Sequence, residues 1–145
     1  MLSISPEQAS QIRQHAKQEY PHECCGAFLG RVVGEDVRWV EEVVPITNEQ
    51  AENRERRFLI TPQQMMALER TAAQKGLKVL GFYHSHPDHP ARPSDYDREN
   101  ALPWYSYLII SVQKGKPAEM HCWRLLDDRS DFEREQMQIR ALEMR

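Results

Sequence analysis

Two histidines separated by one residue carry the strongest chemical signal in this sequence. His84 and His86 follow the apolar, aromatic-rich run from Val79 to Tyr83, which has the composition of a β-strand. Side chains on a strand repeat every two residues, so both imidazoles should point the same way, with Cα atoms roughly 6.5–7 Å apart. From that spacing two ring nitrogens can share a zinc ion at about 2.0–2.1 Å each. We therefore predict a zinc site at the end of this strand, where Pro87 stops the ladder.

A hydrolytic zinc site usually has a third protein ligand and one open position. Three candidates follow the histidines: Asp88, His89 and Asp97. Asp97 also fits a helix capping box, because Ser94 can cap a helix and the acid comes three residues later. Such a cap does not prevent ligation, since a residue in the first helical turn is held rigidly and can point back across the loop. The spacing by itself leaves all three candidates open.

The segment from His84 to His89 also reads H-x-H-x-D-H, which resembles hydrolases of the metallo-β-lactamase fold. Those proteins need a larger αββα sandwich and further downstream ligands. In this chain His121 is the one histidine downstream. This alternative is therefore the weaker one.

Composition narrows the function classes. The chain has 145 residues, which fits a single domain over residues 1–145. Its net charge of −3 gives no electrostatic case for binding nucleic acid or a membrane surface. No stretch approaches the roughly 20 apolar residues of a membrane span, and residues 1–6 do not resemble a signal peptide. We therefore expect a cytoplasmic protein.

The three cysteines are odd in number and two are adjacent, which argues against a disulfide framework and fits reduced thiols. Cys24 and Cys25, with His22 beside them, could suggest a cysteine nucleophile. However, adjacent residues on a strand face opposite sides, and nothing near them would activate a thiolate. We interpret both as small core residues.

The remaining pattern predicts the elements that must position these residues. Helices are expected over residues 5–20, 61–75, 94–101 and 131–145, and strands over 24–30, 37–44, 58–60, 79–83, 105–112 and 119–126. The polar segment 47–57 is expected to be a loop. Strands and helices intermix without a strict βαβ repeat, so the fold class is α+β with a mixed sheet.

A longer pattern contains these residues. H-x-H, then seven residues, then S-x-x-D occurs here as His84, His86, Ser94 and Asp97. Upstream, the run P-H-E-C-C-G places Glu23 just before a predicted strand. This combination resembles the JAMM (MPN-plus) zinc metalloproteases, and most closely their small bacterial and archaeal members. The likeness covers nearly the whole chain.

The resemblance implies a JAMM/MPN-like mixed β-sheet flanked by helices, with a cytidine-deaminase-like architecture. It implies one catalytic Zn²⁺ per chain with a catalytic water, bound by His84, His86 and Asp97. Glu23 would be the general base for that water, and Ser94 would help to stabilise the tetrahedral oxyanion. The chain would therefore be a zinc-dependent metallopeptidase.

Members of this family cleave peptide or isopeptide bonds at the C-terminus of ubiquitin-like proteins, and bacterial relatives of this size often process sulfur-carrier proteins of β-grasp fold. The resemblance thus implies hydrolysis after a C-terminal Gly-Gly, with a ubiquitin-like or sulfur-carrier protein as the partner. A deconjugating isopeptidase of a prokaryotic ubiquitin-like pathway would use the same site. A non-catalytic MPN scaffold is the alternative from another class, but such scaffolds typically lack the ligand set found here.

Two segments should decide between substrates. In eukaryotic deubiquitinating relatives, insertions near residues 47–58 and near residues 98–104 form much of the ubiquitin-binding surface. Both segments are short in this chain. That favours a smaller task than recognition of ubiquitin chains, namely the processing of a protein tail.

Overall fold

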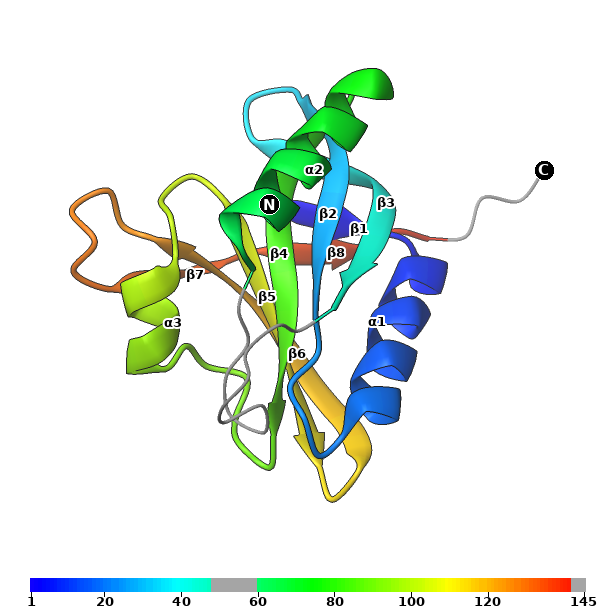
Figure 1. Ribbon diagram of the computed structural model, residues 1–145, viewed down its shortest axis with the longest axis vertical. Helices are drawn as coiled ribbons and strands as arrows, with labels where there is room; N and C mark the ends of the chain where they lie inside the picture. Colours follow the sequence, from blue (N-terminus) through cyan, green and yellow to red (C-terminus); the bar gives the residue numbers. More distant parts are fainter. Residues whose placement is uncertain (48–59, 142–145) are drawn as a thin grey trace.

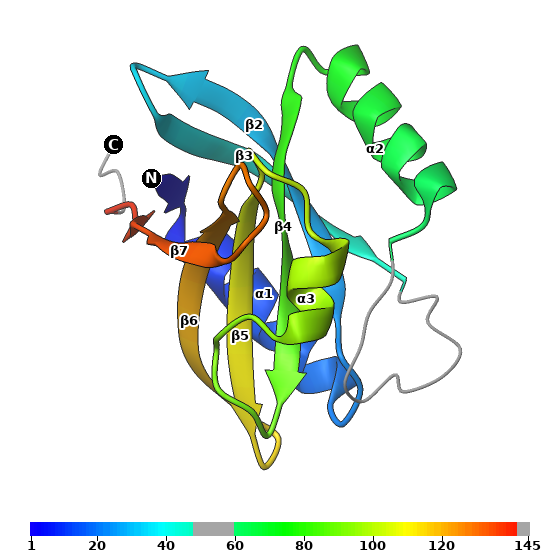
Figure 2. The same cartoon turned by 90° about the vertical axis from the view of Figure 1, so that its left-hand side faces the viewer.

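The computed structural model describes residues 1–47 and 60–141. These residues form one mixed sheet with strand order β7-β6-β5-β4-β2-β3-β1-β8 and helices on both faces (Figures 1 and 2). The strands are β1 (Leu2–Ile4), β2 (Cys25–Val33), β3 (Val37–Ile46), β4 (Lys78–Pro87), β5 (Ser106–Gln113), β6 (Lys116–Leu125), β7 (Phe132–Glu135) and β8 (Met137–Ile139). The helices are α1 (Pro6–Glu19), α2 (Pro62–Gln74) and α3 (Asp95–Asn100). The predicted α+β class with a mixed sheet is confirmed.

The two longer helices begin where their sequence signals predict. Ser5 caps α1 and Thr61 caps α2, and each forms a capping box with the glutamine three residues later. A proline in the first turn follows each cap, where its missing N–H has no consequence. These signals are local, so both starts could be located without tertiary information.

The core lies on both sides of the sheet. One cluster packs between α1 and the sheet and includes Ile12, Phe28 and Tyr83. The other lies on the side of α2 and α3 and includes Leu68 and Phe82. Figure 2 shows α3 in front of β4 and β5, with α1 behind them.

Alternation along β4 decides where the site emerges. Phe82 belongs to the cluster beneath α2 and α3, whereas Tyr83 belongs to the α1 side. His84 and His86 are in phase with Phe82, so they emerge on the α2 and α3 face. Gly26 permits this packing, because a Cβ atom there would lie 2.1 Å from the Tyr83 ring.

The predicted C-terminal helix over residues 131–145 is wrong. Residues 132–135 and 137–139 are strands β7 and β8, and residues 142–145 lie outside the described part. β7 pairs with β6 and β8 pairs with β1, so this segment joins the two edges of the sheet. Leu2 N–H donates to the carbonyl of Gln136 at 2.9 Å and Arg140 N–H donates to that of Ile4 at 2.8 Å.

The physical reason is that edge strands expose unpaired backbone groups, which a further strand satisfies. Glu and Arg favour a helix by only tenths of a kcal/mol per residue. The free energy gained by pairing with neighbouring strands routinely exceeds so small a preference. Strand β1, which is one of these partners, was itself not predicted. Without β1, the need for a pairing partner in residues 137–139 could not be inferred.

Other boundaries differ slightly. β3 continues past its expected end at Val44 and includes Pro45, which is tolerated because β1 pairs only with Arg38 and Trp39, leaving that end of β3 free of β1. The predicted strand 58–60 and the predicted loop 47–57 fall largely on residues 48–59, outside the described part. In the described part of the chain, none of the helices has the length and apolar character needed to cross a membrane.

Candidate metal centre

His84 and His86 stand together at the end of β4. Their Nε2 atoms are 3.1 Å apart, and both side chains are buried. The prediction that the two rings share one face is confirmed. Convergence of the two nitrogens is what a shared metal ion requires.

Asp97 completes a triangle with them. It lies in the first turn of α3, and its Oδ2 atom is 3.2 Å from His84 Nε2 and 3.1 Å from His86 Nε2. Ligand atoms of a tetrahedral zinc site with bonds of about 2.0–2.1 Å lie roughly 3.3–3.4 Å apart. Two nitrogens and one carboxylate oxygen in this arrangement therefore fit a zinc ion in both chemistry and spacing.

The capping box that the sequence predicts is present, and it orients the carboxylate of Asp97. Ser94 Oγ accepts the N–H of Asp97 at 3.1 Å, and Asp97 Oδ2 accepts the N–H of Ser94 at 2.9 Å. The same oxygen faces both histidines. The cap and the metal centre thus use one carboxylate, and the cap fixes its direction.

The protonation states also suit a metal. His86 Nδ1 is 2.9 Å from the carbonyl of Pro90, which can only accept, so Nδ1 carries the proton and Nε2 is left as the donor atom for a metal. Burial lowers the pKa of His84, against the opposing effect of Asp97. Burial raises the pKa of Asp97, but the two histidines lower it further, so it lies below its usual range. A neutral imidazole and an ionised carboxylate are the ligating forms.

The two other candidates for third ligand lie elsewhere. Asp88 is exposed at the turn after β4, where its carboxylate accepts the Tyr20 hydroxyl at 2.6 Å and the N–H of Lys114 at 2.7 Å. His89 is exposed, and its carbonyl accepts the Ser111 hydroxyl at 2.6 Å. Of the three candidate third ligands that the spacing left open, Asp97 is the one that lies beside His84 and His86.

Glu23 is a second acid beside the histidines. It is 2% exposed, and its Oε1 atom is 3.9 Å from His86 Nε2. Glu23, His84 and His86 could together hold a metal, because their ligand atoms lie within 4.8 Å of one another. Asp97 lies closer to His86 than Glu23 does, so the distances favour Asp97 as ligand and leave Glu23 with room for a water molecule.

Ser85 joins the two parts of the site, a role that sequence reasoning missed. The N–H of Cys24 donates to Ser85 Oγ at 2.8 Å, and the N–H of Ser85 donates to the carbonyl of Cys24 at 3.1 Å. Ser85 points to the face opposite the histidines, so it ties the turn that carries Glu23 to the strand that carries them. A small polar residue between two histidines was the available signal.

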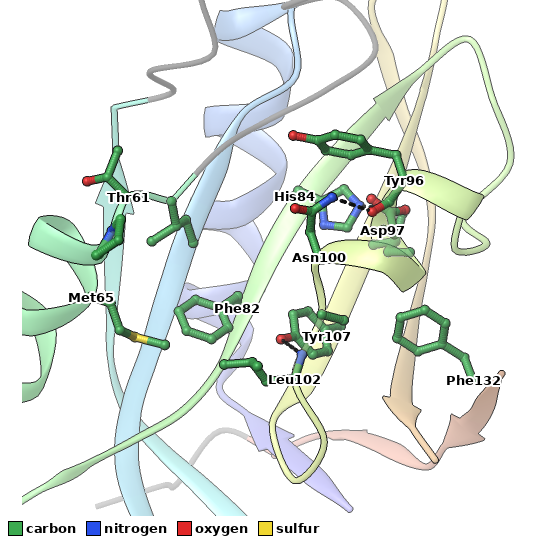
Figure 3. A pocket seen from close by; sticks show the side chains of 14 residues that line it. Thr61, Met65, Phe82, His84, Tyr96, Asp97, Asn100, Leu102, Tyr107 and Phe132 are labelled. Atoms are coloured by element: carbon green, nitrogen blue, oxygen red, sulfur yellow. Dashed lines mark hydrogen bonds and ion pairs between the residues drawn. The ribbon is translucent and has the colours of Figure 1, made fainter. Parts of the chain in front are cut away.

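Two cavities meet at this centre. The larger, of about 580 Å³, is lined by Glu23, His86 and Ser94 together with the loop that follows β4. The smaller, of about 270 Å³, is lined mainly by apolar side chains, with His84 and Asp97 at one end. Figure 3 shows His84 pointing toward Asp97 there, with Phe82 and Met65 further along the cavity. The centre therefore has space on both sides.

The cysteine residues do not belong to the chemistry. Burial raises the pKa of Cys24 and of Cys25 to about 12. A thiol that remains protonated at neutral pH is a poor nucleophile. Their interpretation as core residues is confirmed.

The model of the Prok-JAB family, prokaryotic homologs of the JAB domain, matches residues 5–126. The chain belongs to this family.

Three relatives of this Prok-JAB protein have names that describe their functions. A desampylase of Haloferax volcanii is 34% identical over 76% of this chain and 80% of its own length. A probable TtuB-protein conjugate cleaving protease of Thermus thermophilus is 32% identical over 70% and 64%. The tail tip assembly protein K of Escherichia phage N15 is 37% identical over 72% of this chain, but only 38% of its own length.

Solved structures share this fold. A protein from Desulfitobacterium hafniense is similar with a TM-score of 0.82 and 32% identity, over 97% of this chain and 93% of that one. A JAB1/MPN domain protein from Archaeoglobus fulgidus has a TM-score of 0.59 at 20% identity, over 97% and 98%. The latter likeness shows the fold alone. This Prok-JAB protein is thus a small JAMM/MPN family member and a hydrolase.

Proposed function

We propose that this Prok-JAB protein is a zinc metallopeptidase that hydrolyses the peptide or isopeptide bond after the C-terminal Gly-Gly of a β-grasp protein, either ubiquitin-like or a sulfur carrier. The observation that carries the proposal is the triangle of His84, His86 and Asp97 with Glu23 beside it. The names of two relatives, a desampylase and a conjugate cleaving protease, support a substrate of the ubiquitin-like class.

One Zn²⁺ per chain would be held by His84, His86 and Asp97. When bound there, zinc would supply Lewis-acid chemistry, which would make water nucleophilic near neutral pH and polarise a peptide carbonyl. The protein contributes a buried, pre-arranged donor set, so little reorganisation accompanies binding of the metal.

Glu23 acts as the general base and then as the acid. Its carboxylate takes a proton from the attacking water and returns it to the departing amine as the carbon–nitrogen bond breaks. Its Oε1 atom lies 3.9 Å from His86 Nε2, so Glu23 is beside the three proposed ligands and is not one of them. Such proton transfer typically contributes about 10²–10⁴-fold in rate.

Ser94 stabilises negative charge on the substrate oxygen. In the capping box its Oγ accepts an N–H, which uses a lone pair and not the hydroxyl proton. The proton can therefore be donated into the larger cavity, which Ser94 and Glu23 both line. A donor of this kind is worth about 10²–10³-fold in turnover.

The acyl side of the substrate approaches through the smaller cavity. Glycines permit close approach of a backbone to the centre, which suits a Gly-Gly tail. Side chains earlier in the tail would then meet the apolar walls formed by Met65, Phe82 and Leu102 (Figure 3).

A single metallopeptidase domain over residues 1–145, acting in the cytoplasm, completes the proposal. Deconjugation of ubiquitin-like modifiers is the second candidate function, and the names of the same two relatives favour it. A non-catalytic scaffold is disfavoured because the full donor set is assembled.

The proposal is tested with purified zinc-loaded protein and a β-grasp protein whose tail continues beyond Gly-Gly. Mass spectrometry should show release of everything after the second glycine, and a chelator should stop it. The Glu23→Gln variant is the matched control, because it removes the base and keeps the shape of the side chain. If the zinc-loaded protein leaves both the extended tail and a Gly-Gly isopeptide intact, the proposal is wrong.

A further inference from the structure

The larger cavity holds an arginine that the mechanism does not use. Arg92 lies in the loop between β4 and α3 and lines this cavity together with Glu23 and Ser94. Its side chain is exposed. Its guanidinium forms no hydrogen bond or ion pair with residues 1–47 or 60–141. A cation therefore faces the reaction space with its donors available.

The loop holds Arg92 in a defined place. Three successive carbonyls before it are anchored: that of His89 by Ser111, that of Pro90 by His86, and that of Ala91 by the indole N–H of Trp123 at 3.1 Å. The N–H of Arg92 itself donates to the carbonyl of Pro90 at 2.8 Å. Because the backbone of this loop is fixed at these points, binding would not have to order the segment that carries Arg92.

The direction of the substrate follows from Glu23. Because this carboxylate returns the proton to the departing amine, the amine must lie within its reach. Glu23 does not line the smaller, apolar cavity; it lines the larger one and a third of about 370 Å³ beside α1. Of these two, the larger cavity is the one that His86 and Ser94 also line, so the leaving group occupies the larger cavity. Arg92 therefore faces the leaving group and not the Gly-Gly tail.

The charges of the cavity select the leaving group. Asp95, the other acid near Arg92, also lines this cavity, but its side chain is 94% exposed and its carboxylate lies 3.7 Å from the guanidinium of Arg98, with which it pairs. A lysine in an isopeptide bond would offer the guanidinium only neutral backbone groups at this position. A residue at the end of a chain carries an α-carboxylate, which a guanidinium binds in a bidentate manner.

Resting on the proposed function, we propose that Arg92 binds the α-carboxylate of the leaving group, so that the preferred substrate is a β-grasp tail extended beyond Gly-Gly by a short piece with a free C-terminus. The enzyme would then trim protein tails in preference to cleaving isopeptides. The cavity, of about 580 Å³, has room for one or two released residues.

The experiment compares three substrates with the same β-grasp protein as acyl part: a tail ending Gly-Gly-Ala with a free carboxylate, the same tail with a terminal carboxamide, and a Gly-Gly isopeptide to a lysine with blocked termini. Wild-type kcat/KM should be at least about ten-fold higher for the free acid than for the carboxamide. Arg92→Ala should lower the free acid to the carboxamide level and leave the carboxamide unchanged. Arg70→Ala, which removes an exposed arginine of α2, should change neither.

A binding measurement separates recognition from turnover. In the Glu23→Gln background, calorimetry should show tighter binding of the free acid than of the carboxamide, and Arg92→Ala should remove this difference. Equal wild-type rates for acid and carboxamide, an equal loss for both in Arg92→Ala, or faster cleavage of the isopeptide would each overturn the inference while leaving the proposed function intact. Cleavage of none of the three would overturn the proposed function itself.

Discussion

Replacing Asp97 with alanine should cause two losses that can be measured separately. The first is the capping box of α3, because Asp97 Oδ2 accepts the N–H of Ser94. The second is one corner of the donor triangle, because the same oxygen faces His84 and His86. The first loss should appear with or without zinc, and the second only when zinc is present.

The magnitudes differ enough to distinguish them. Loss of a helix cap costs about 0.5–2 kcal/mol of stability. Zinc at a free concentration of about 1,000 times its Kd stabilises the folded protein by about 4.1 kcal/mol. For a domain of this size that corresponds to roughly 8–16 °C in Tm. If the lost ligand costs at least about 100-fold in affinity, about 1.4 kcal/mol or less remains, which is roughly 3–6 °C.

Matched variants separate the loss of the helix cap from the loss of the metal ligand. Ser94→Ala removes the other half of the capping box and keeps the carboxylate, so its zinc-dependent increment in Tm should stay close to that of the wild type. Among the described residues, Asp88→Ala loses the hydrogen bonds with Tyr20 and Lys114, and it should also keep the increment. The double variant Asp97→Ala with Glu23→Gln tests whether the nearby acid substitutes as a ligand.

The assay is thermal unfolding in chelator and in buffered free zinc, with zinc content measured by mass spectrometry after dialysis. Wild type, Ser94→Ala and Asp88→Ala should each retain about one zinc, and Asp97→Ala should retain much less. A full zinc-dependent increment in Asp97→Ala would refute the assignment. If that increment disappeared only in the double variant, Glu23 would be the third ligand.

Three further predictions concern the base, its support and the thiols. Glu23→Gln should retain zinc and lose about 10²–10⁴-fold in kcat, as measured with any substrate that the wild type cleaves; near-normal turnover would remove Glu23 from the mechanism. Ser85→Ala leaves the buried N–H of Cys24 without its acceptor at 2.8 Å, so it should lower the free energy of unfolding by about 1–3 kcal/mol. It should also lower kcat while the zinc content stays unchanged, which kinetics and metal analysis check together. With pKa values raised by burial from 9.0 to about 12, Cys24 and Cys25 should resist alkylation in the native protein at pH 8. Because the folded pKa exceeds the unfolded one, their contribution to stability is complete below about pH 9 and is lost as the pH rises toward 12, which unfolding curves between pH 8 and 11 would detect.

Part of the site could be predicted from sequence because it is local. His84 and His86 lie on one strand, whose two-residue period fixes their shared direction. Asp97 lies in the first turn of a helix whose cap, Ser94, is recognisable from its neighbours. Backbone geometry over these few residues already brings the ring nitrogens to one face.

The spacing alone could not choose among Asp88, His89 and Asp97. Asp88 follows the histidines too closely to turn back, and it closes a turn with Tyr20 and Lys114. Similarly, the position of Glu23 depends on the pairing of β2 with β4, in which Cys25 lies opposite His84. That contact spans some sixty residues of sequence, and only the sheet register creates it.

The amino-acid sequence by itself determined the histidine strand, the helix caps, the α+β class and the separation of charged from apolar segments, since each depends on neighbours along the chain. The tertiary structure decided which acid faces the histidines, which acid stands back as a base, and that the charged C-terminal segment completes the sheet as β7 and β8. The physical reason is the same in all three cases. Hydrogen-bond partners and dielectric surroundings come from strands distant in sequence, and those contacts outweigh the small local preferences of the residues concerned.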